Sequence, residues 1–153
     1  TVVRDGPNGI GSVQLYIEPS ADRGDDRHFW GSCELPVERL VLFDHVVNNA
    51  DRKIGHCLRD RFGKVWGIDH GLTFNRYPKL RTVLWQHVGA LIAPSLRADL
   101  RRFQTSTAEF GCELSPWLAD VEIDALFARV DRLVESGEYP PLNPRRNVPY
   151  GWW

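Results

Sequence analysis

A short β-hairpin with a carboxylate at each end constrains this chain more than any other feature of its sequence. Residues 56–58 start a strand, residues 59–63 are a polar turn that ends in glycine, and residues 64–68 return as the second strand. Asp51 precedes this hairpin and Asp69 follows it. Because a hairpin brings its two ends together, we expect both carboxylates to lie near each other. The alternative is a surface hairpin with ordinary solvated Asp–Arg pairs.

Two carboxylates in this arrangement suit phosphoryl transfer, in which one faces the attacking hydroxyl and the other holds a metal ion on the phosphates. The exact residues are more specific, since residues 49–56 fit Asn-x-Asp-Arg-x-x-x-His and residues 68–74 fit Ile-Asp-x-Gly-Leu-x-Phe. This linked pair of motifs resembles the catalytic and metal-binding segments of the phosphatidylinositol 3-/4-kinase-like superfamily. Within that superfamily it most resembles the type II phosphatidylinositol 4-kinases and a group of actinobacterial kinase-like proteins.

The resemblance implies roles for three residues of the first motif. Asp51 is expected to be the catalytic-loop aspartate that orients or deprotonates the acceptor hydroxyl. Lys53 is expected to offset charge on the transferred phosphoryl group. Arg52 is expected to pair with a neighbouring acid and fix the catalytic loop. The cofactors implied are ATP and Mg²⁺, and the acceptor is a protein, lipid or small-molecule hydroxyl.

The metal side of the site departs from the family in one position. Asp69 matches the metal-binding aspartate, but His56 stands where the family has a metal-binding Asn. Mg²⁺ prefers oxygen ligands over imidazole. We expect His56 or Asn49 to complete the site with Asp69. The departure leaves open an alternative function, a nucleotide-binding pseudokinase or interaction module without turnover.

The first 18 residues are predicted to form a hairpin whose second strand covers 12–18. By resemblance this is the last hairpin of a kinase N-terminal lobe, followed by a hinge that binds adenine through the backbone of Tyr16, Ile17 and Glu18. A phosphate loop is the alternative for the glycine-rich turn, although no helix or Lys-Ser/Thr pair follows it. The family's N-terminal lobe also carries a strand lysine, and no lysine precedes Lys53. We therefore expect the chain to be a fragment that is inactive alone.

Helical spacing of apolar residues predicts helices over 36–47, 80–85, 94–103 and 120–136. Ser115-Pro116 is a further helix start, and the helix from Asp120 is either a separate helix, which makes about five, or its continuation. Gly137 closes the last helix. These helices and two small hairpins predict an α+β fold, and the resemblance implies that residues 19–138 form a protein-kinase-like C-terminal lobe. Residues 139–153 read as a Pro-rich, extended tail that packs back on the domain or docks a partner.

Composition excludes several classes of partner. The chain of 153 residues has a net charge of −1, so no basic excess indicates nucleic acid. It contains no apolar run of about 18 residues, so we expect no membrane span. Its three cysteines, Cys33, Cys57 and Cys112, lack metal-ligand spacing and predict reduced thiols in a cytoplasmic protein. His45 on the first predicted helix is interpreted as a core residue, with a zinc site of His45, His56 and an Asp as the alternative.

Overall fold

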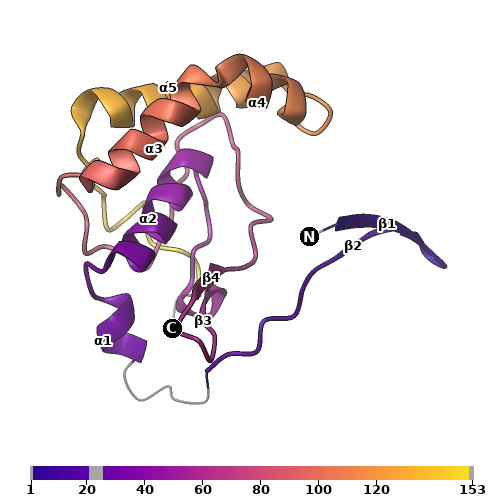
Figure 1. Ribbon diagram of the computed structural model, residues 1–153, viewed down its shortest axis with the longest axis horizontal. Coiled ribbons are helices and arrows are strands. Elements are labelled where there is room, and N and C mark those ends of the chain that lie inside the picture. Colours follow the sequence, from indigo (N-terminus) through magenta and orange to yellow (C-terminus); the bar gives the residue numbers. More distant parts are fainter. Residues whose placement is uncertain (1, 21–25, 152–153) are drawn as a thin grey trace.

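The computed structural model describes residues 2–20 and 26–151, and these residues have a mixed α+β fold. The described helices are α1 (Asp26–Trp30), α2 (Leu35–Val47), α3 (Pro94–Thr105), α4 (Thr107–Leu114) and α5 (Asp120–Ser136), with one 3-10 turn, Ile54–His56. The strands form two antiparallel pairs, β1 (Val2–Gly6) with β2 (Gly9–Val13) and β3 (Cys57–Arg59) with β4 (Val65–Gly67). In Figure 1, α3, α4 and α5 lie together above one end of α2, and β3 and β4 lie near its other end. The α+β expectation is confirmed.

Helix α2 is the buried centre of the molecule, as its apolar spacing predicts. Pro36 lies in its first turn, where proline costs no hydrogen bond. Its buried apolar residues are Val37, Leu40, Val41, Leu42 and Val47. The helix ends at Asn48, which adopts a left-handed conformation with φ 56° and donates its backbone N–H to the carbonyl of Asp44. Asparagine tolerates this conformation better than most residues, so the chain leaves the helix sharply and enters the candidate catalytic loop.

The predicted hairpin between Asp51 and Asp69 is confirmed as β3 and β4, in which Cys57 pairs with Gly67. Its turn is organised by Asp60, whose carboxylate accepts the backbone N–H groups of Phe62 and Lys64 and the indole N–H of Trp66. The Trp66 indole and these backbone donors hold the pKa of Asp60 below its usual value. A polar turn with such local hydrogen bonds fixes the register of the hairpin.

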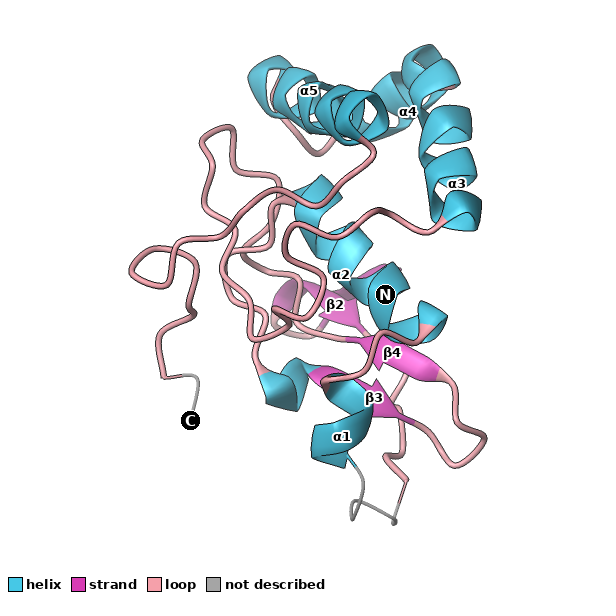
Figure 2. Cartoon of the chain, turned by 90° about the vertical axis from the view of Figure 1, so that its left-hand side faces the viewer, coloured by secondary structure: helices cyan, strands magenta, loops and turns pink. Residues whose placement is uncertain are grey.

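Helix α5 packs against both α2 and α3 and completes the core (Figure 2). The apolar stripe predicted on α5 is buried, with Ile123, Leu126, Phe127, Val130 and Leu133 all less than 9% exposed. Gly137 closes α5 in a left-handed conformation, as expected. Glu38 of α2 accepts hydrogen bonds from the backbone of Ala93 and the hydroxyl of Tyr139. This buried carboxylate ties α2 to the start of α3 and to the chain after α5.

The expected helix over 80–85 is wrong. This stretch is extended, and Thr82 pairs in parallel with Arg52 of the candidate loop. The β-branched neighbours Thr82 and Val83 favour an extended backbone, and hydrogen bonds to the loop replace those of a helix. Ser115 is also not a helix start, since it caps the C-terminus of α4, a helix that the apolar pattern did not reveal.

The two ends of the chain differ in their packing. Strands β1 and β2 are exposed throughout and project from the body of the molecule (Figure 1). The second strand ends at Val13, so residues 14–18 continue without strand pairing. The tail packs back as expected, with Tyr139 and Pro149 less than 2% exposed. The terminal Trp152 and Trp153 lie outside the described residues.

Phe29 and Trp30 anchor the chain before α2, since both are buried and their rings meet edge to face. All three cysteines are free. Within the described part of the chain, none of the helices combines the length and the apolar character needed to cross a membrane.

Candidate catalytic and metal-binding site

A fully buried ion pair forms the base of the candidate site. The Nε and Nη2 atoms of Arg52 donate to the two carboxylate oxygens of Asp44, each at 2.8 Å. Both side chains are at most 1% exposed. Burial alone would lower the pKa of Arg52, but the hydrogen bond and charge of Asp44 outweigh it and raise the pKa above its usual value. A planar guanidinium is suited to this two-point contact, so Arg52 is held in one orientation.

The remaining guanidinium nitrogen of Arg52 connects the loop to the hairpin. Its Nη1 atom donates to the carbonyl oxygen of His56 at 3.1 Å and to that of Ile68 at 2.9 Å. The backbone N–H of Ile68 also donates to the carbonyl of His56. One guanidinium therefore joins helix α2, the candidate loop and both ends of the hairpin. The expectation that Arg52 pairs with an acid and fixes the loop is confirmed, and its burial excludes direct contact with a substrate.

The loop itself is held by backbone and side-chain hydrogen bonds. The Asn49 amide donates to Asp44 at 2.9 Å, and its oxygen accepts the backbone N–H of Asp51 at 3.0 Å. Both polar groups of this fully buried side chain are therefore used inside the loop. Arg52 forms backbone hydrogen bonds with Arg81 and Val83 on the neighbouring extended segment. Asp51 thus follows a well-anchored stretch of loop, and its side chain is 22% exposed.

His56 lies between the two candidate acids. Its Nδ1 is 3.0 Å from the carbonyl oxygen of Asp51, and its Nε2 is 3.4 Å from a carboxylate oxygen of Asp69. The carboxylate of Asp51 forms an ion pair with Lys53 at 2.8 Å. The side chain of Asp69 is 61% exposed, so it is open to a ligand. The structure therefore brings together four of the predicted site residues, Asp51, Lys53, His56 and Asp69.

The contact between His56 and Asp69 can be made in two ways. Nδ1 faces the carbonyl of Asp51, so it is the donor in that hydrogen bond. Nε2 faces a carboxylate oxygen of Asp69, and either a proton or a metal cation between these two atoms would join them. Neighbouring ligands of an octahedral Mg²⁺ with bonds of about 2.1 Å lie roughly 3 Å apart. The two atoms of His56 and Asp69 therefore fit a divalent cation, although one of them is nitrogen.

Asp69 is held in an uncommon backbone conformation, with φ 55°. Non-glycine residues at positive φ are uncommon and often concentrate at functional sites. The turn before Asp69 is tightly packed, because a Cβ added to Gly67 would lie 2.7 Å from Leu40 and 3.2 Å from His70. The ring of His70 packs edge-on against Phe43, and burial lowers its pKa. These contacts hold the carboxylate of Asp69 on the side of His56.

The expected hinge residues are not joined to this cluster. Tyr16, Ile17 and Glu18 lie on the unpaired segment after β2, and the side chain of Tyr16 is 81% exposed. Within the described residues, no hydrogen bond, ion pair or ring contact links these three to the loop. The chain meets the hairpin at the next two residues, where Pro19 pairs with Asp60 and the backbone N–H of Ser20 donates to the carbonyl of Arg59.

His45 is a core residue, as interpreted. It is 8% exposed, its ring packs against Tyr139, and burial lowers its pKa to about 4. The described residues contain no group of three or more His, Cys, Asp and Glu side chains placed to hold a metal ion. The zinc alternative with His45 and His56 is therefore not supported.

Sequence reasoning missed the role of Asp44. A carboxylate on the apolar spacing of a helix expected to be buried requires a cation nearby, and this signal points to Arg52 in the following loop. Glu38 carried no such signal, since its partner Tyr139 lies 101 residues further on.

Comparison with known proteins gives one informative relative. Protein Rv2133c of Mycobacterium tuberculosis is 30% identical over 185 aligned positions, which cover 98% of this chain. The chain spans 66% of the length of that mycobacterial protein. No family model and no solved structure matches the chain. This chain is therefore a distant homologue of a mycobacterial protein whose name states no activity. Its function must be argued from the site.

Proposed function

We propose that this chain carries the catalytic and metal-binding half of an ATP- and Mg²⁺-dependent phosphotransferase that acts on a hydroxyl acceptor. The observation that supports this most is the position of His56 between the backbone of Asp51 and the carboxylate of Asp69. The order of elements adds support, since a buried helix, a rigid loop, a hairpin and an exposed aspartate also follow one another in a kinase C-terminal lobe. The resemblance of the two motifs assigns the same residues.

The residues would divide the work between acceptor and metal. Asp69 and His56 would hold Mg²⁺, which when bound neutralises charge on the phosphates. Asp51 would accept the proton of the acceptor hydroxyl, because its partly exposed carboxylate lies on a well-anchored loop. Lys53 neutralises Asp51 in the free protein, and in the complex it would turn to the transferred phosphoryl group. Arg52 is a positioning residue that holds both halves of the site.

The second candidate is a nucleotide-binding protein without turnover. His56 favours it, because an imidazole replaces the oxygen ligand that Mg²⁺ prefers. The ion pair between Lys53 and Asp51 favours it as well, since it occupies the carboxylate that would accept the proton of the acceptor hydroxyl. In both functions we place the protein in the cytoplasm, where its free cysteines stay reduced.

The test is Mg²⁺-dependent nucleotide affinity, measured by calorimetry on the longest form of the protein that its gene encodes. Asp69→Asn keeps the size of the side chain and removes its charge, so affinity in Mg²⁺ should fall by at least about tenfold. Asp51→Asn should abolish phosphoryl transfer but leave nucleotide affinity within about twofold, because it acts on the acceptor side. Asp124→Asn, at an exposed position on α5, is the matched control and should change neither.

Equal affinity in the wild type and in both variants of the site would refute the assignment of Asp69. Metal-dependent binding that never leads to turnover, with any acceptor tried, would instead establish the second candidate.

A further inference from the structure

Two segments of the chain carry basic residues and no acidic ones. Residues 70–98 and 139–153 contain six of the 19 Lys and Arg residues and none of the 20 Asp and Glu residues. The rest of the chain contains 13 basic and 20 acidic residues, so these two segments carry an excess of positive charge although the whole chain has a net charge of −1. Charge of a single sign on one surface attracts and orients partners of the opposite sign.

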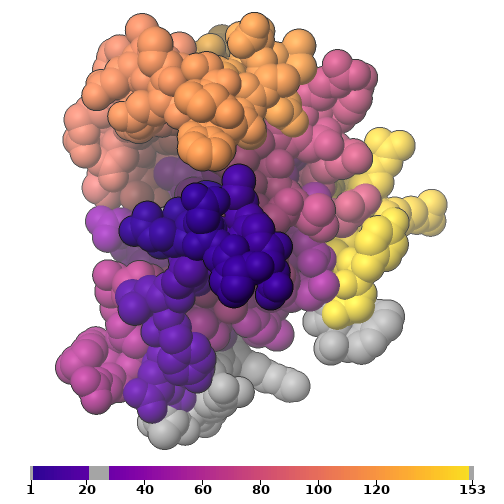
Figure 3. All heavy atoms as spheres, turned by 90° about the vertical axis from the view of Figure 1, so that its right-hand side faces the viewer, coloured from indigo at the N-terminus to yellow at the C-terminus, as the bar shows by residue number. Residues whose placement is uncertain are grey.

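The structure places the two segments side by side. The backbone N–H of Thr82 donates to the carbonyl of Asn147 at 2.9 Å, and the amide of Asn147 donates to the carbonyl of Leu80 at 2.6 Å. The guanidinium of Arg81 lies 5.0 Å from the ring centre of Tyr150. In Figure 3 the yellow tail lies against neighbouring pink residues of the first segment. We call the cations of this joined surface the basic strip, which consists of Arg76, Lys79, Arg81, Arg145 and Arg146.

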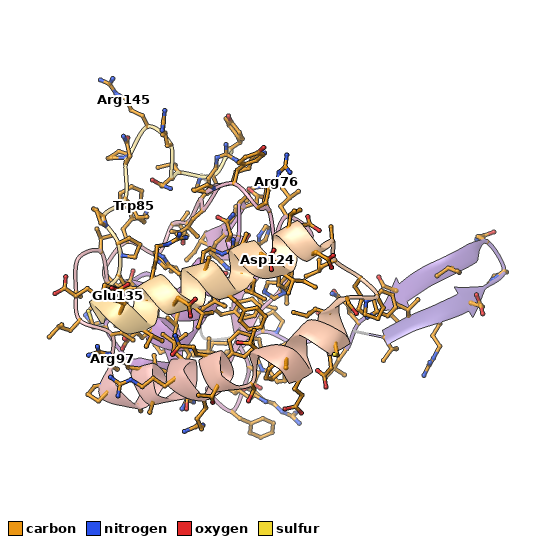
Figure 4. All side chains as sticks on the ribbon, turned by 90° about the horizontal axis from the view of Figure 1, so that it is seen from above. Arg76, Trp85, Arg97, Asp124, Glu135 and Arg145 are labelled. Atoms are coloured by element: carbon orange, nitrogen blue, oxygen red, sulfur yellow. The ribbon has the colours of Figure 1, made fainter. Side chains whose placement is uncertain are left out.

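The charges of the basic strip face solvent. Four of its residues are exposed and Arg81 is half-buried. Figure 4 shows Arg76 and Arg145 on the side of α5 that faces away from α3. None of the five forms an ion pair with another residue in 2–20 or 26–151. Arg97 does not belong to the strip, because its guanidinium packs at Gly137 and donates to the carbonyl of Val134.

The basic strip borders the loop that carries Asp51. Arg81 donates its backbone N–H to the carbonyl of Asn49, and its own carbonyl accepts the N–H of Arg52. The side chain of Asn48 bonds to the carbonyls of Asn75 and Tyr77 and to the N–H of Lys79. A partner bound along the strip would therefore lie next to the candidate catalytic carboxylate.

We propose that the acceptor is an acidic polypeptide segment, whose Asp and Glu side chains bind the basic strip while its hydroxyl side chain reaches Asp51. This inference rests on the proposed phosphotransferase function. The cations are spread over two extended segments that also expose the rings of Tyr77 and Tyr150, and this layout suits an extended chain. A short acidic segment would contact only the strip. A bilayer or a long nucleic acid would also contact the rest of the molecule, where 20 acidic residues outnumber 13 basic ones, and such charges act over a Debye length of about 10 Å.

The experiment measures peptide binding by fluorescence anisotropy, without nucleotide. The probe is a short labelled peptide of Asp and Glu with one central Ser, and its isostere carries Asn and Gln instead. The strip variant combines the substitutions Arg76→Gln, Lys79→Gln, Arg145→Gln and Arg146→Gln. A matched control removes the same charge from exposed positions elsewhere, through Arg39→Gln, Arg61→Gln, Arg101→Gln and Arg132→Gln.

We expect the acidic peptide to bind with an affinity that falls as salt is added. The strip variant should weaken binding about tenfold or more, since several modest ion pairs are lost together, and the control should stay within about twofold. Equal binding of the isostere would overturn the proposal, and so would an equal loss in both variants. Binding of anionic vesicles or of an oligonucleotide through the strip, without binding of the peptide, would overturn it in favour of that partner.

The outcome separates this inference from the function on which it rests. A protein that binds Mg²⁺ and nucleotide but not the peptide refutes only the acidic acceptor. A protein that binds the peptide but no nucleotide refutes the phosphotransferase and leaves the strip as a docking surface.

Discussion

Arg52 is the residue on which the geometry of the candidate site depends most. It is fully buried and contacts Asp44, His56 and Ile68, so it joins a helix to both ends of a hairpin. A buried pair of this kind adds little stability relative to apolar residues, but removing one partner leaves the other charge uncompensated. We therefore infer that the main role of this ion pair is to hold helix α2, the loop of Arg52 and the ends of the hairpin in a fixed relative position.

We predict that Arg52→Ala lowers the free energy of unfolding by about 3–5 kcal/mol. Removing both partners, as in Arg52→Met with Asp44→Leu, should recover part of this loss because no unpaired charge remains buried. Arg101→Ala, at an exposed site on α3, should change stability by less than about 0.5 kcal/mol. Urea titration measures all three, and a loss for Arg52→Ala as small as that of Arg101→Ala would contradict the role given to the buried pair.

Gly67 supplies a second prediction at the scale of one residue. A Cβ at this position would lie 2.7 Å from Leu40 and 3.4 Å from Arg52, inside a packed region. Gly67→Ala should therefore destabilise the protein by about 1–3 kcal/mol through overpacking. Gly55→Ala is the matched control, since nothing lies within 4 Å of its added Cβ. Thermal unfolding compares the two, and similar melting temperatures would show that the turn before Asp69 is not tightly packed.

At the scale of elements, the sequence was sufficient to predict those helices and strands whose stabilising contacts come from residues nearby in the sequence. The hairpin β3–β4 follows from a polar turn whose Asp60 bonds to its own neighbours. Helices α2, α3 and α5 follow from apolar spacing with Pro or Gly at their ends. The helix predicted over 80–85 is wrong because the backbone hydrogen bonds of this stretch go to Arg52 and Asn147, which lie far away in the sequence.

In the site as well, contacts between residues close in the sequence were predictable, and those that depend on distant residues were not. The four clustered residues belong to two motifs linked by a hairpin, so their approach was predictable. The use of Asn49 inside the loop was not, since it depends on where Asp44 points. The link between Glu38 and Tyr139 joins distant parts of the chain, and no periodicity in the sequence encodes it.

The projecting hairpin gives a prediction for an element. Strands β1 and β2 pair with each other and are exposed throughout, and an isolated two-stranded hairpin is marginally stable at best. Deleting residues 1–13 should therefore change the free energy of unfolding by less than about 0.5 kcal/mol. Deleting the chain from residue 140 onward should cost much more, because Pro149 is buried and Asn147 bonds to the segment beside the loop. Urea titration of both truncations would contradict this account if the first were the more damaging.

At the scale of the whole molecule, a buried aromatic cluster joins α2, the loop before α3 and the tail. The rings of His45 and His87 both pack against the ring of Tyr139, whose hydroxyl donates a hydrogen bond to Glu38. Burial lowers the pKa of His45 to about 4, with a smaller effect from His87, and burial also lowers the pKa of His87. Both rings are therefore neutral in the folded protein at neutral pH.

This cluster predicts acid sensitivity. Unfolded histidine has a pKa of about 6.5, so the folded state binds fewer protons than the unfolded state below that pH. The stabilisation is complete above pH 6.5 and is lost as the pH falls toward 4. His45→Phe keeps the ring contact with Tyr139 and should flatten the fall in urea midpoint between pH 7 and 5. An unchanged pH dependence in this variant would show that His45 is not a source of the acid sensitivity.

The central claim, that Asp69 and His56 form a metal site used with a nucleotide, is tested most directly by paramagnetic broadening. Mn²⁺ replaces Mg²⁺ at oxygen-rich sites and broadens the NMR signals of nearby amides. With Mn²⁺ and ATP, the account predicts loss of the amide signals of residues 54–56 and 67–71, while those of α4 stay sharp. Asp69→Asn should restore the lost signals. Full intensity at 54–56 and 67–71 under saturating Mn²⁺ and ATP, or identical broadening in Asp69→Asn, would contradict it.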